Sequence, residues 1–508
     1  MGVDSTHPLY DQKVKAWRQM RDTHSGQPAV KDAGPLYLSP TAGMELDGLK
    51  QTAQPGAKAY AAYKARAVFP ELVSDAIEAM LGVMHHKPPV IELPESMEPL
   101  RERATLQGES LVMFLRRLNE EQLATGRAGM LAEVPDDNAA KLPLIALYIA
   151  EDVINWDEGD RQGIEVDNLN VVGLNESAFV RLENFEWEFK KKYRMLILGD
   201  PLENEPTGKG VYRAGEFDED SSEFNETALV TPSIAGRTSD EIPFVFVNAK
   251  DIVPEPDDPP LLGLSNAALT IYRGEADYRQ ALFLQGQDTL VVSGDTVEGE
   301  VVYRTGAGAS ISLPMGGDAK FIGVDSTGLS EMRSALENDH ARAQVKAGQL
   351  VDESSRAKES GDALRIRVAA RTATLNQIAL AGAFALQEIL RKIARWIGAD
   401  PEQVVVEPNL DFTDEVMTGA DLAAFLGAKM LGAPLSGESI HKMMTDKGVT
   451  EKTFEEELEV LAKEAENEIL NPPPATDEDG LEDDEDEGGD DNAGDDEGDD
   501  NDEGDGEG

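Results

Sequence analysis

The sequence predicts an α+β protein that divides into several folding units. Its 508 residues can bury a substantial core, enough for more than one unit. Segments with alternating apolar side chains, typical of strands, concentrate before residue 258, and long segments with an apolar side chain every three or four residues, typical of helices, follow. A small glycine-rich segment with strand patterns interrupts those helices. This mixture of helical and strand segments predicts the α+β class.

Residues 1–258 begin with helices and continue into mixed structure. An apolar helical pattern from Tyr60 to Leu81 stops at Pro88, and another helix is expected at residues 111–123. The clearest strand pattern places Phe185, Trp187 and Phe189 on one face and charged residues on the other, which predicts a half-buried antiparallel strand. Strands or short helices are expected at residues 130–134 and 142–150, and further strands at residues 193–198 and 242–247.

The next part of the chain predicts helices around a small β insert. After Pro259 and Pro260 a helix is expected at residues 262–284, followed by strands at residues 290–292, 301–303, 310–313 and 321–324 with glycine turns between them. A second helix covers about residues 329–350 and a charged loop follows at 352–361. A long helix then runs from about Leu364 to Trp396, and we expect a bend near Gly382. Helices that run out to an insert and return predict a stalk with a small head.

Both helices beside the charged loop carry an apolar stripe that is too long for one compact domain to cover. We therefore expect neighbouring copies to cover these stripes in a head-to-tail assembly. The alternative is a large enzyme that buries both helices in its own core. The residues expected to contact another subunit are Leu329, Met332, Leu336, Leu375 and Ile378.

The charge of the chain limits its partners. The formal net charge is −52, and 20 of the 98 acids lie from Asp477 onward, where there is no Lys or Arg. The rest of the chain keeps 78 acids against 46 bases, a charge of −32. Tight binding to nucleic acid needs clusters of Lys and Arg side chains, so the acidic composition disfavours it. Passing contact with DNA is compatible with this composition, because an acidic surface repels phosphate and does not retain it.

Other features of the composition narrow the class further. The chain has no cysteine, which excludes disulfides and thiolate metal sites. No segment approaches the length needed to span a bilayer and the start lacks a signal-peptide pattern, so we expect a soluble intracellular protein without a membrane partner.

A search for catalytic motifs predicts no enzyme, cofactor or metal site. His85 and His86 are adjacent, but no second ligand cluster accompanies them, so we interpret them as turn residues. The triplet Gly208-Lys209-Gly210 lacks the rest of a phosphate loop. No metalloprotease or hydrolase motif occurs.

The C-terminal part predicts short helices and then a disordered tail. Thr418 and Asp421 form a capping-box pattern before one helix, a second includes Ile440, and a third begins near Thr450. In residues 471–508, the part after Pro474 is nearly all Asp, Glu and Gly. Such a segment has too few apolar side chains to bury and is expected to be disordered. The tail could act by repulsion, as a decoy for basic partners or by collecting divalent cations, and repulsion needs the least sequence order.

The order of these elements resembles the portal proteins of tailed bacteriophages, which are the head-to-tail connectors. The resemblance rests on Pro259-Pro260-Leu261 before the first stalk helix and on the charged loop before the long helix. The N-terminal region resembles one portal-like subfamily through His7-Pro8-Leu9-Tyr10, Trp17, Arg21-Asp22, Gly26, Ala29-Val30-Lys31, Gly34 and Tyr37-Leu38. The resemblance extends to Leu470.

The resemblance implies a division of the chain into the parts of a portal subunit. Residues 1–258 would be the wing, 259–285 and 327–351 the two stem helices, and 286–326 the clip. Residues 352–361 would be the tunnel loop, 362–410 the long kinked helix with a return strand, 411–470 the helical crown, and 471–508 the acidic tail. The residues expected to face DNA in the loop are Asp352, Glu353, Arg356, Lys358 and Glu359.

The resemblance also implies a function and partners. A ring, usually of twelve copies, would occupy one capsid vertex in the virion and serve as the channel for DNA packaging and ejection, with transient contact to double-stranded DNA. The clip would dock the large subunit of the terminase motor and later the head-tail adaptor proteins of the neck, and the ring would contact capsid or scaffolding protein during assembly in the host cytoplasm. The main alternative is an acidic chaperone or nucleic-acid mimic that acts through its C-terminal tail.

Overall fold

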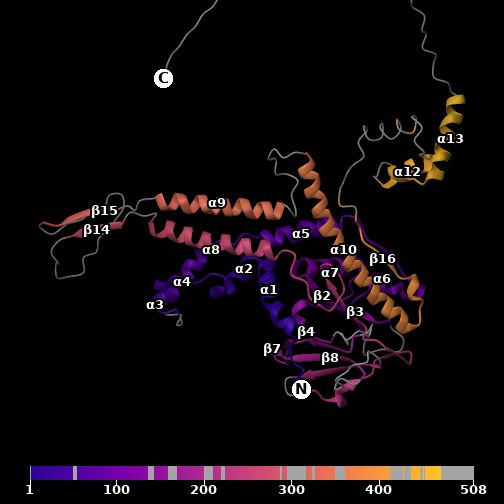
Figure 1. Ribbon diagram of the computed structural model, residues 1–508, viewed down its shortest axis with the longest axis horizontal. Coiled ribbons are helices and arrows are strands. Elements are labelled where there is room, and N and C mark those ends of the chain that lie inside the picture. Colours follow the sequence, from indigo (N-terminus) through magenta and orange to yellow (C-terminus); the bar gives the residue numbers. More distant parts are fainter. Residues whose placement is uncertain are drawn as a thin grey trace, which may run out of the picture. The chain divides into compact units, whose positions relative to one another are not determined.

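The computed structural model describes residues 2–49, 54–134, 142–157, 169–199, 210–218, 223–285, 289–293, 316–322, 327–348, 361–410, 412, 427, 429, 436–446, 450 and 452–470. The chain forms two units, Met1–Phe412 and Thr413–Gly508. Figure 1 shows the elements along the chain. The predicted α+β class is confirmed.

Helices make up the first part of the larger unit. Apolar residues repeat with helical spacing, so each helix buries one face: α5 buries Val73, Ile77, Met80 and Met84. Helix α7 is capped by Ser110, whose hydroxyl accepts from the Met113 amide, and it ends at Gly126 in the left-handed conformation. The helices are α1 (Pro8–Ser25), α2 (Gln27–Asp32), α3 (Ala42–Leu46), α4 (Pro55–Arg66), α5 (Leu72–Met84), α6 (Pro99–Glu102) and α7 (Leu111–Thr125).

Two antiparallel sheets follow these helices. One has the strand order β10-β9-β8-β5-β4 and the other the order β13-β2-β3. The strands expected at residues 193–198 and 242–247 are β8 and β13, and the segments 130–134 and 142–150, expected as strands or short helices, correspond to the strands β2 and β3. The bounds are β2 (Arg127–Glu133), β3 (Leu144–Ile149), β4 (Val153–Trp156), β5 (Val171–Asn175), β8 (Lys192–Leu198), β9 (Tyr212–Asp218), β10 (Leu229–Val230) and β13 (Phe244–Asn248).

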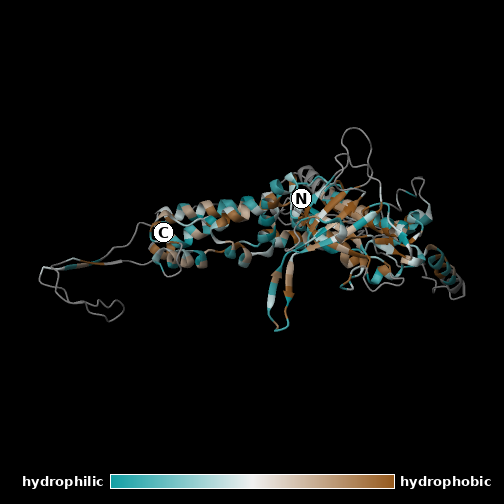
Figure 2. Ribbon diagram, turned by 90° about the horizontal axis from the view of Figure 1, so that it is seen from below, coloured by the Kyte–Doolittle hydropathy of each residue, from teal (hydrophilic) through white to brown (hydrophobic). Residues whose placement is uncertain are grey.

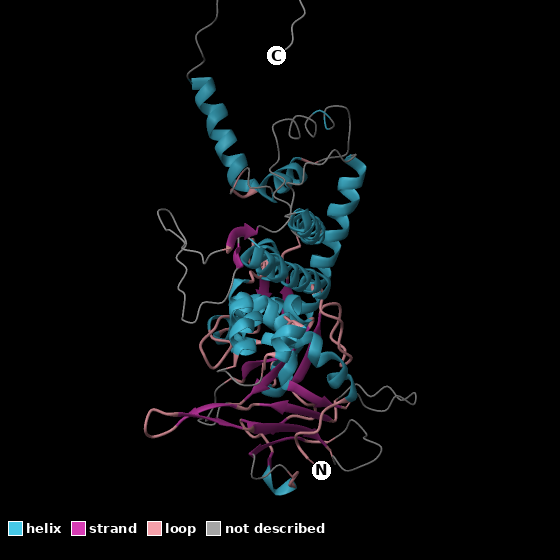
Figure 3. Ribbon diagram, turned by 90° about the vertical axis from the view of Figure 1, so that its left-hand side faces the viewer, coloured by secondary structure: helices cyan, strands magenta, loops and turns pink. Residues whose placement is uncertain are grey.

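Three smaller strand pairs complete this unit. Strand β1 (Val90–Glu92) pairs with β16 (Val405–Glu407), and β11 (Ser233–Ile234) pairs with β12 (Arg237–Thr238). A hairpin of β6 (Ala178–Arg181) and β7 (Trp187–Lys190) projects from the body (Figures 2 and 3).

The long helix α10 (Gly361–Ile397) packs against both the helices and the sheets of the larger unit, chiefly against α7 and β13. Its buried residues Leu386, Ile389 and Ile393 share a core with Leu115 of α7 and Val245 of β13. The helix passes through Gly382 without a break, as its bounds show. Its stripe is therefore covered by this chain along the part whose side chains are described.

A pair of helices, α8 (Leu262–Gln285) and α9 (Thr327–Gly348), forms the predicted stalk. The two pack against each other, and α8 also contacts α1, α4 and α5 of the body. Strands β14 (Thr289–Ser293) and β15 (Asp318–Ile322) pair antiparallel at the end of the stalk away from the body (Figure 1). The strands expected at residues 301–303 and 310–313 lie outside the described residues.

The second unit contains α12 (Gly437–Asp446) and α13 (Phe454–Leu470). Helix α13 begins four residues later than expected because Thr453 caps it: the Glu456 amide donates to the Thr453 hydroxyl at 3.3 Å, and the Thr453 amide donates to the Glu456 carboxylate at 2.9 Å. The Thr418 capping box and the acidic tail lie outside the described residues. Within the part of the chain that the structure describes, no helix is long and apolar enough to cross a bilayer.

Candidate assembly and channel surfaces

The residues predicted to face DNA lie in a segment that the structure does not describe. Asp352, Glu353, Arg356, Lys358 and Glu359 all fall in the gap between α9 and α10. The description resumes at Gly361, the first residue of α10. Their role therefore stays a prediction.

The residues predicted to contact another subunit are largely covered by their own chain. Leu375 and Ile378 are 3% and 2% exposed, and both belong to a core with Met20, Val73 and Leu264. The premise that a neighbour must cover them is wrong, because the N-terminal helices supply that cover. A pattern along one helix marks which face is buried, but it does not identify the covering element.

In the stalk, Leu336 fills the contact between the two helices. A Cβ atom built at Gly274 of α8 would lie 2.9 Å from Leu336 Cδ2, so the glycine allows α9 to approach closely. Leu336 is 8% exposed, whereas Leu329 and Met332 are half-buried. Large apolar side chains that remain exposed on the stalk include Phe283, Leu284 and Val345.

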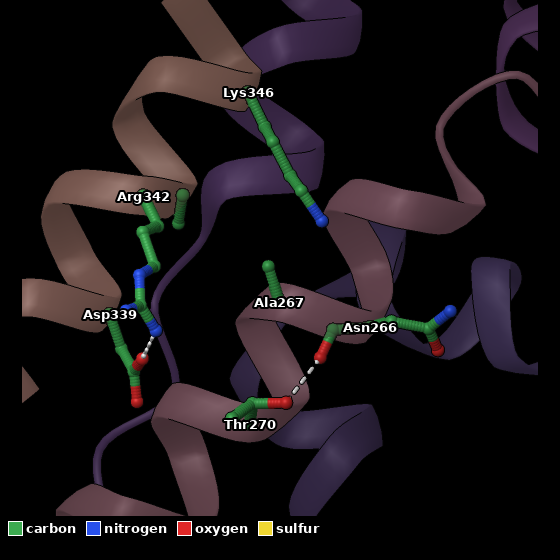
Figure 4. Close-up of a pocket in the computed structure, with 7 residues that line it drawn as sticks. Asn266, Ala267, Thr270, Asp339, Arg342 and Lys346 are labelled. Atoms are coloured by element: carbon green, nitrogen blue, oxygen red, sulfur yellow. Dashed lines mark hydrogen bonds and ion pairs between the residues drawn. The ribbon is translucent and has the colours of Figure 1, made fainter.

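A shallow pocket of about 250 Å³ lies between α8 and α9 (Figure 4). Asn266, Ala267 and Thr270 line it from α8, and Asp339, Arg342, Ala343 and Lys346 line it from α9. Arg342 pairs with Asp339 at 3.5 Å, and the Lys346 side chain reaches across toward α8 in Figure 4. The lining of the pocket therefore carries two cationic side chains and one carboxylate.

Helix α10 is held by buried amide groups that the sequence did not reveal. Gln122 Nε2 donates to the backbone carbonyls of Asn248, at 2.7 Å, and of Ile378, at 3.3 Å. Its Oε1 accepts from Asn119 Nδ2 at 2.8 Å, and Asn119 Oδ1 lies 2.9 Å from His85 Nε2. A network of this kind joins α5, α7, β13 and α10, and each amide satisfies a group that would otherwise be buried without a partner.

His85 takes part in this network as the residue that follows α5. Burial lowers the pKa of His85, and the hydrogen bond to Asn119 opposes that shift only in part. The imidazole is therefore neutral near pH 7 and serves as a structural hydrogen-bonding group. Among the described residues, no group of three His, Asp or Glu is placed to hold a metal ion.

Two largely buried arginines link elements of the body. The Arg127 guanidinium lies 4.5 Å from the ring centres of both Trp156 and Phe246, and its Nη1 donates to the Pro254 carbonyl at 2.7 Å. Burial lowers the pKa of Arg127 to about 9. Arg21 joins Glu121 and Glu151 with contacts of 2.9 Å and 2.8 Å. These groups fix the packing of the body.

The hairpin of β6 and β7 corrects one expectation about the alternating pattern. Phe185 does not belong to the strand: it lies in the turn with a φ of 63°, a conformation that side-chain-bearing residues rarely adopt. Trp187 and Phe189 do share a face, but they are 64% and 52% exposed and so are not half-buried in this chain. The alternation correctly indicated an apolar face, and it gave no information on what covers that face.

One part of the chain matches a known protein family. Residues 260–397, which contain α8, β14, β15, α9 and α10, match a family described as Domain of unknown function (DUF4055). No curated protein matches the chain.

The chain is also similar to solved structures from gene transfer agent (GTA) particles. The structure titled "Virion of native gene transfer agent (GTA) particle" is 14% identical, with 73% of this chain and 89% of that chain covered and a TM-score of 0.35. "Neck of native GTA particle computed with C12 symmetry" is 13% identical, with the same coverage and a TM-score of 0.36. "Neck of empty GTA particle computed with C6 symmetry" is 14% identical, with 74% and 89% covered and a TM-score of 0.35.

Proposed function

We propose that this chain is the portal protein of a tailed bacteriophage, which forms a ring at one capsid vertex and provides the channel for DNA packaging and ejection. The observation that carries the proposal is the arrangement of α8, the β14–β15 hairpin, α9 and α10, in the order that the sequence resemblance implies. Its role is one of assembly, and no catalytic step is assigned to it.

The stalk supports a ring because its own chain covers so little of α9. At 1.5 Å per residue, α9 with its 22 residues is about 33 Å long. Among its described side chains, only Leu336 and Ala343 are buried, and both lie along the contact with α8. A long helix that is packed on one side needs further neighbours for stability, and the stalks of adjacent copies in a ring supply them.

The hairpin at the end of the stalk suits a docking role. Strands β14 and β15 pair through five residues each, and they stand outside the two large sheets. We assign to residues 286–326 the contact with the terminase large subunit during packaging and with the head-tail adaptor proteins afterwards. Capsid or scaffolding protein would contact the ring as it assembles in the host cytoplasm, before it becomes part of the virion.

The net charge supports a channel that passes DNA without holding it. A charge of −32 on residues 1–476 repels phosphate, and the charge accumulates with every copy in the ring. Arg356 and Lys358 are the candidates for transient phosphate contacts, which weaken quickly as salt rises.

Light scattering on the purified protein tests the proposal. Twelve chains of 55.0 kDa would give a particle of about 660 kDa. Only monomers or dimers at micromolar concentration would contradict the ring. A chain that lacks residues 472–508 should still form rings, whereas an acidic chaperone that acts through its tail would lose its activity.

Fluorescence anisotropy with linear duplex DNA provides a second test. We expect weak binding at physiological salt. Nanomolar affinity would contradict the proposed low-friction channel and would favour a true nucleic-acid-binding protein.

A further inference from the structure

The β6–β7 hairpin and its connections, residues 176–191, form an arm that continues the five-stranded sheet. Strands β5 and β8 lead directly into it, and the Glu176 amide donates to the Lys192 carbonyl at 2.7 Å. The Lys192 amide donates to the Ser177 hydroxyl at 3.2 Å, and that hydroxyl donates to Asn175 Oδ1 at 2.6 Å. These bonds pin the base of the arm, so it leaves the body as a preorganised ribbon (Figures 2 and 3).

One face of the arm is aromatic. Phe179 pairs with Phe189 and Arg181 pairs with Trp187, and because directly opposed residues share a face, all four side chains lie on one side. The rings of Phe179 and Phe189 meet edge-on with centres 5.3 Å apart, and the Arg181 guanidinium lies 4.5 Å from the centre of the Phe185 ring at the turn. The opposite face carries Val180, Glu188 and other small or charged residues.

No part of the described chain covers the aromatic face. The four aromatic side chains, Phe179, Phe185, Trp187 and Phe189, are 65%, 76%, 64% and 52% exposed. At roughly 150–250 Å² per ring this leaves about 400–600 Å² of apolar surface, which is as large as the largest patch on a typical monomer. A two-stranded hairpin is at best marginally stable in water, so a face of this kind needs a partner.

The charge of the arm indicates which partner. Residues 176–191 contain three basic residues, Arg181, Lys190 and Lys191, and four acidic ones, Glu176, Glu183, Glu186 and Glu188. The arm thus carries a charge of only −1, whereas residues 1–476 together carry −32. Two copies of so acidic a chain repel each other over most of their surfaces, and an arm with almost no net charge reaches a neighbour with little of that repulsion.

We propose that the arm docks with its aromatic face on the adjacent copy of this chain in the ring, so that each copy gives one arm and receives one. The inference rests on the proposed ring and specifies one of its contacts. About 400–600 Å² is half to three quarters of the roughly 800 Å² that a stable interface buries on each partner, and the stalks contribute the rest. When one surface of each copy contacts a different surface of the next copy, the copies form a closed ring if the rotation between neighbours divides a full turn evenly.

Tryptophan fluorescence tests this contact directly. The chain has four tryptophans. Trp17, Trp156 and Trp396 are at most 3% exposed, so Trp187 is the one that solvent reaches in a single copy. In rings isolated by size exclusion, acrylamide should quench the wild-type protein no more than the Trp187→Phe variant. If quenching falls clearly in the variant, Trp187 is exposed in the ring and the arm does not dock there.

A pair of matched variants tests whether the contact matters for assembly. Phe179→Ser with Phe189→Ser should raise the concentration needed for ring formation at least roughly tenfold, the equivalent of about 1.4 kcal/mol. Val180→Ser, on the opposite face and 45% exposed, should assemble like the wild type. Circular dichroism checks that both variants fold. Equal assembly of the two variants would overturn the proposal.

The outcomes separate this inference from the proposed function. If the wild-type protein forms no ring, the proposed function fails. If rings form and Trp187 stays open to acrylamide, only the arm contact fails. Protection of Trp187 that arises solely after another virion protein is added would also overturn the contact, because the occupant would then be that protein.

Discussion

The side chain of Gln122 in α7 donates a hydrogen bond to the backbone carbonyl of Ile378 in α10, although the two residues are 256 positions apart in the sequence. The contact exists because Gly382, one turn further along α10, has no side chain. A Cβ atom at Gly382 would lie 2.5 Å from Asn119 Nδ2 and 2.6 Å from Gln122 Oε1. The buried amides therefore occupy the space beside the long helix that this glycine leaves.

The first prediction is that Gly382→Ala destabilises the protein. Alanine favours a helix by up to about 1 kcal/mol, but here two buried amides must shift, which costs roughly 1–3 kcal/mol. The midpoint of urea unfolding should therefore fall. Gly82→Ala is the matched control, because a Cβ atom added at Gly82 in α5 would have no neighbouring atom within 4 Å, and this variant should be as stable as the wild type or more so. A Gly382→Ala protein as stable as the control would contradict the account.

The second prediction concerns Asp152. Burial, followed by the negative charge of Glu151, raises the pKa of this carboxyl from 3.8 to about 7. Between these pH values the folded state keeps a proton that the unfolded state releases, so stability falls as pH rises through this window. Asp152→Asn removes the ionisation.

Asp152→Asn should leave stability near pH 4 unchanged and increase it at pH 8, by roughly 1–4 kcal/mol. Urea unfolding at both pH values measures the difference between variant and wild type. Asp47→Asn at an exposed position is the control and should show no such dependence. A difference that does not change with pH would show that Asp152 ionises normally.

The third prediction is that Leu336→Ala loosens the stalk and leaves the body intact. Removing a buried leucine side chain costs roughly 2–5 kcal/mol, and α9 has α8 as its main contact within the described chain. Amide hydrogen exchange should accelerate along α9, while α7 and α10 keep their protection. Val345→Ala, at a position 58% exposed, serves as the control. Acceleration in both variants alike would argue against this contact.

The fourth prediction tests the charged loop. Changing both Arg356 and Lys358 to Ala should leave ring formation intact but alter the packaging or retention of DNA, because their phosphate contacts are lost. Packaged genome length and infectivity measure the effect. Normal values for both would remove these two residues from the mechanism.

Local patterns predicted the helices well but not their partners. The spacing of apolar residues placed the α8 and α9 helices within a few residues, because a buried helix face repeats along the chain. The same spacing marked Leu375 and Ile378 as apolar but could not show that Met20 and Val73 cover them. The choice of covering element depends on residues that are distant in sequence.

Polar contacts and exposed faces were hardest to predict. Nothing in the sequence around Gln122 marks this helix residue as buried and hydrogen-bonded. Its acceptors, the backbone carbonyls of Asn248 and Ile378, come from other parts of the chain. The alternation around Trp187 indicated an apolar face, and burial was assumed because most such faces are buried in their own chain. That assumption fails for the face of Trp187 and Phe189, because this chain leaves both side chains exposed.

Electron microscopy of the purified protein tests the central claim most directly. Class averages should show closed rings with a central opening and rotational symmetry, most often of twelve copies, although the isolated protein can differ by about one copy. The stalks formed by α8 and α9 should lie side by side around the opening. Averages that show only single copies or open pairs at micromolar concentration would contradict the account.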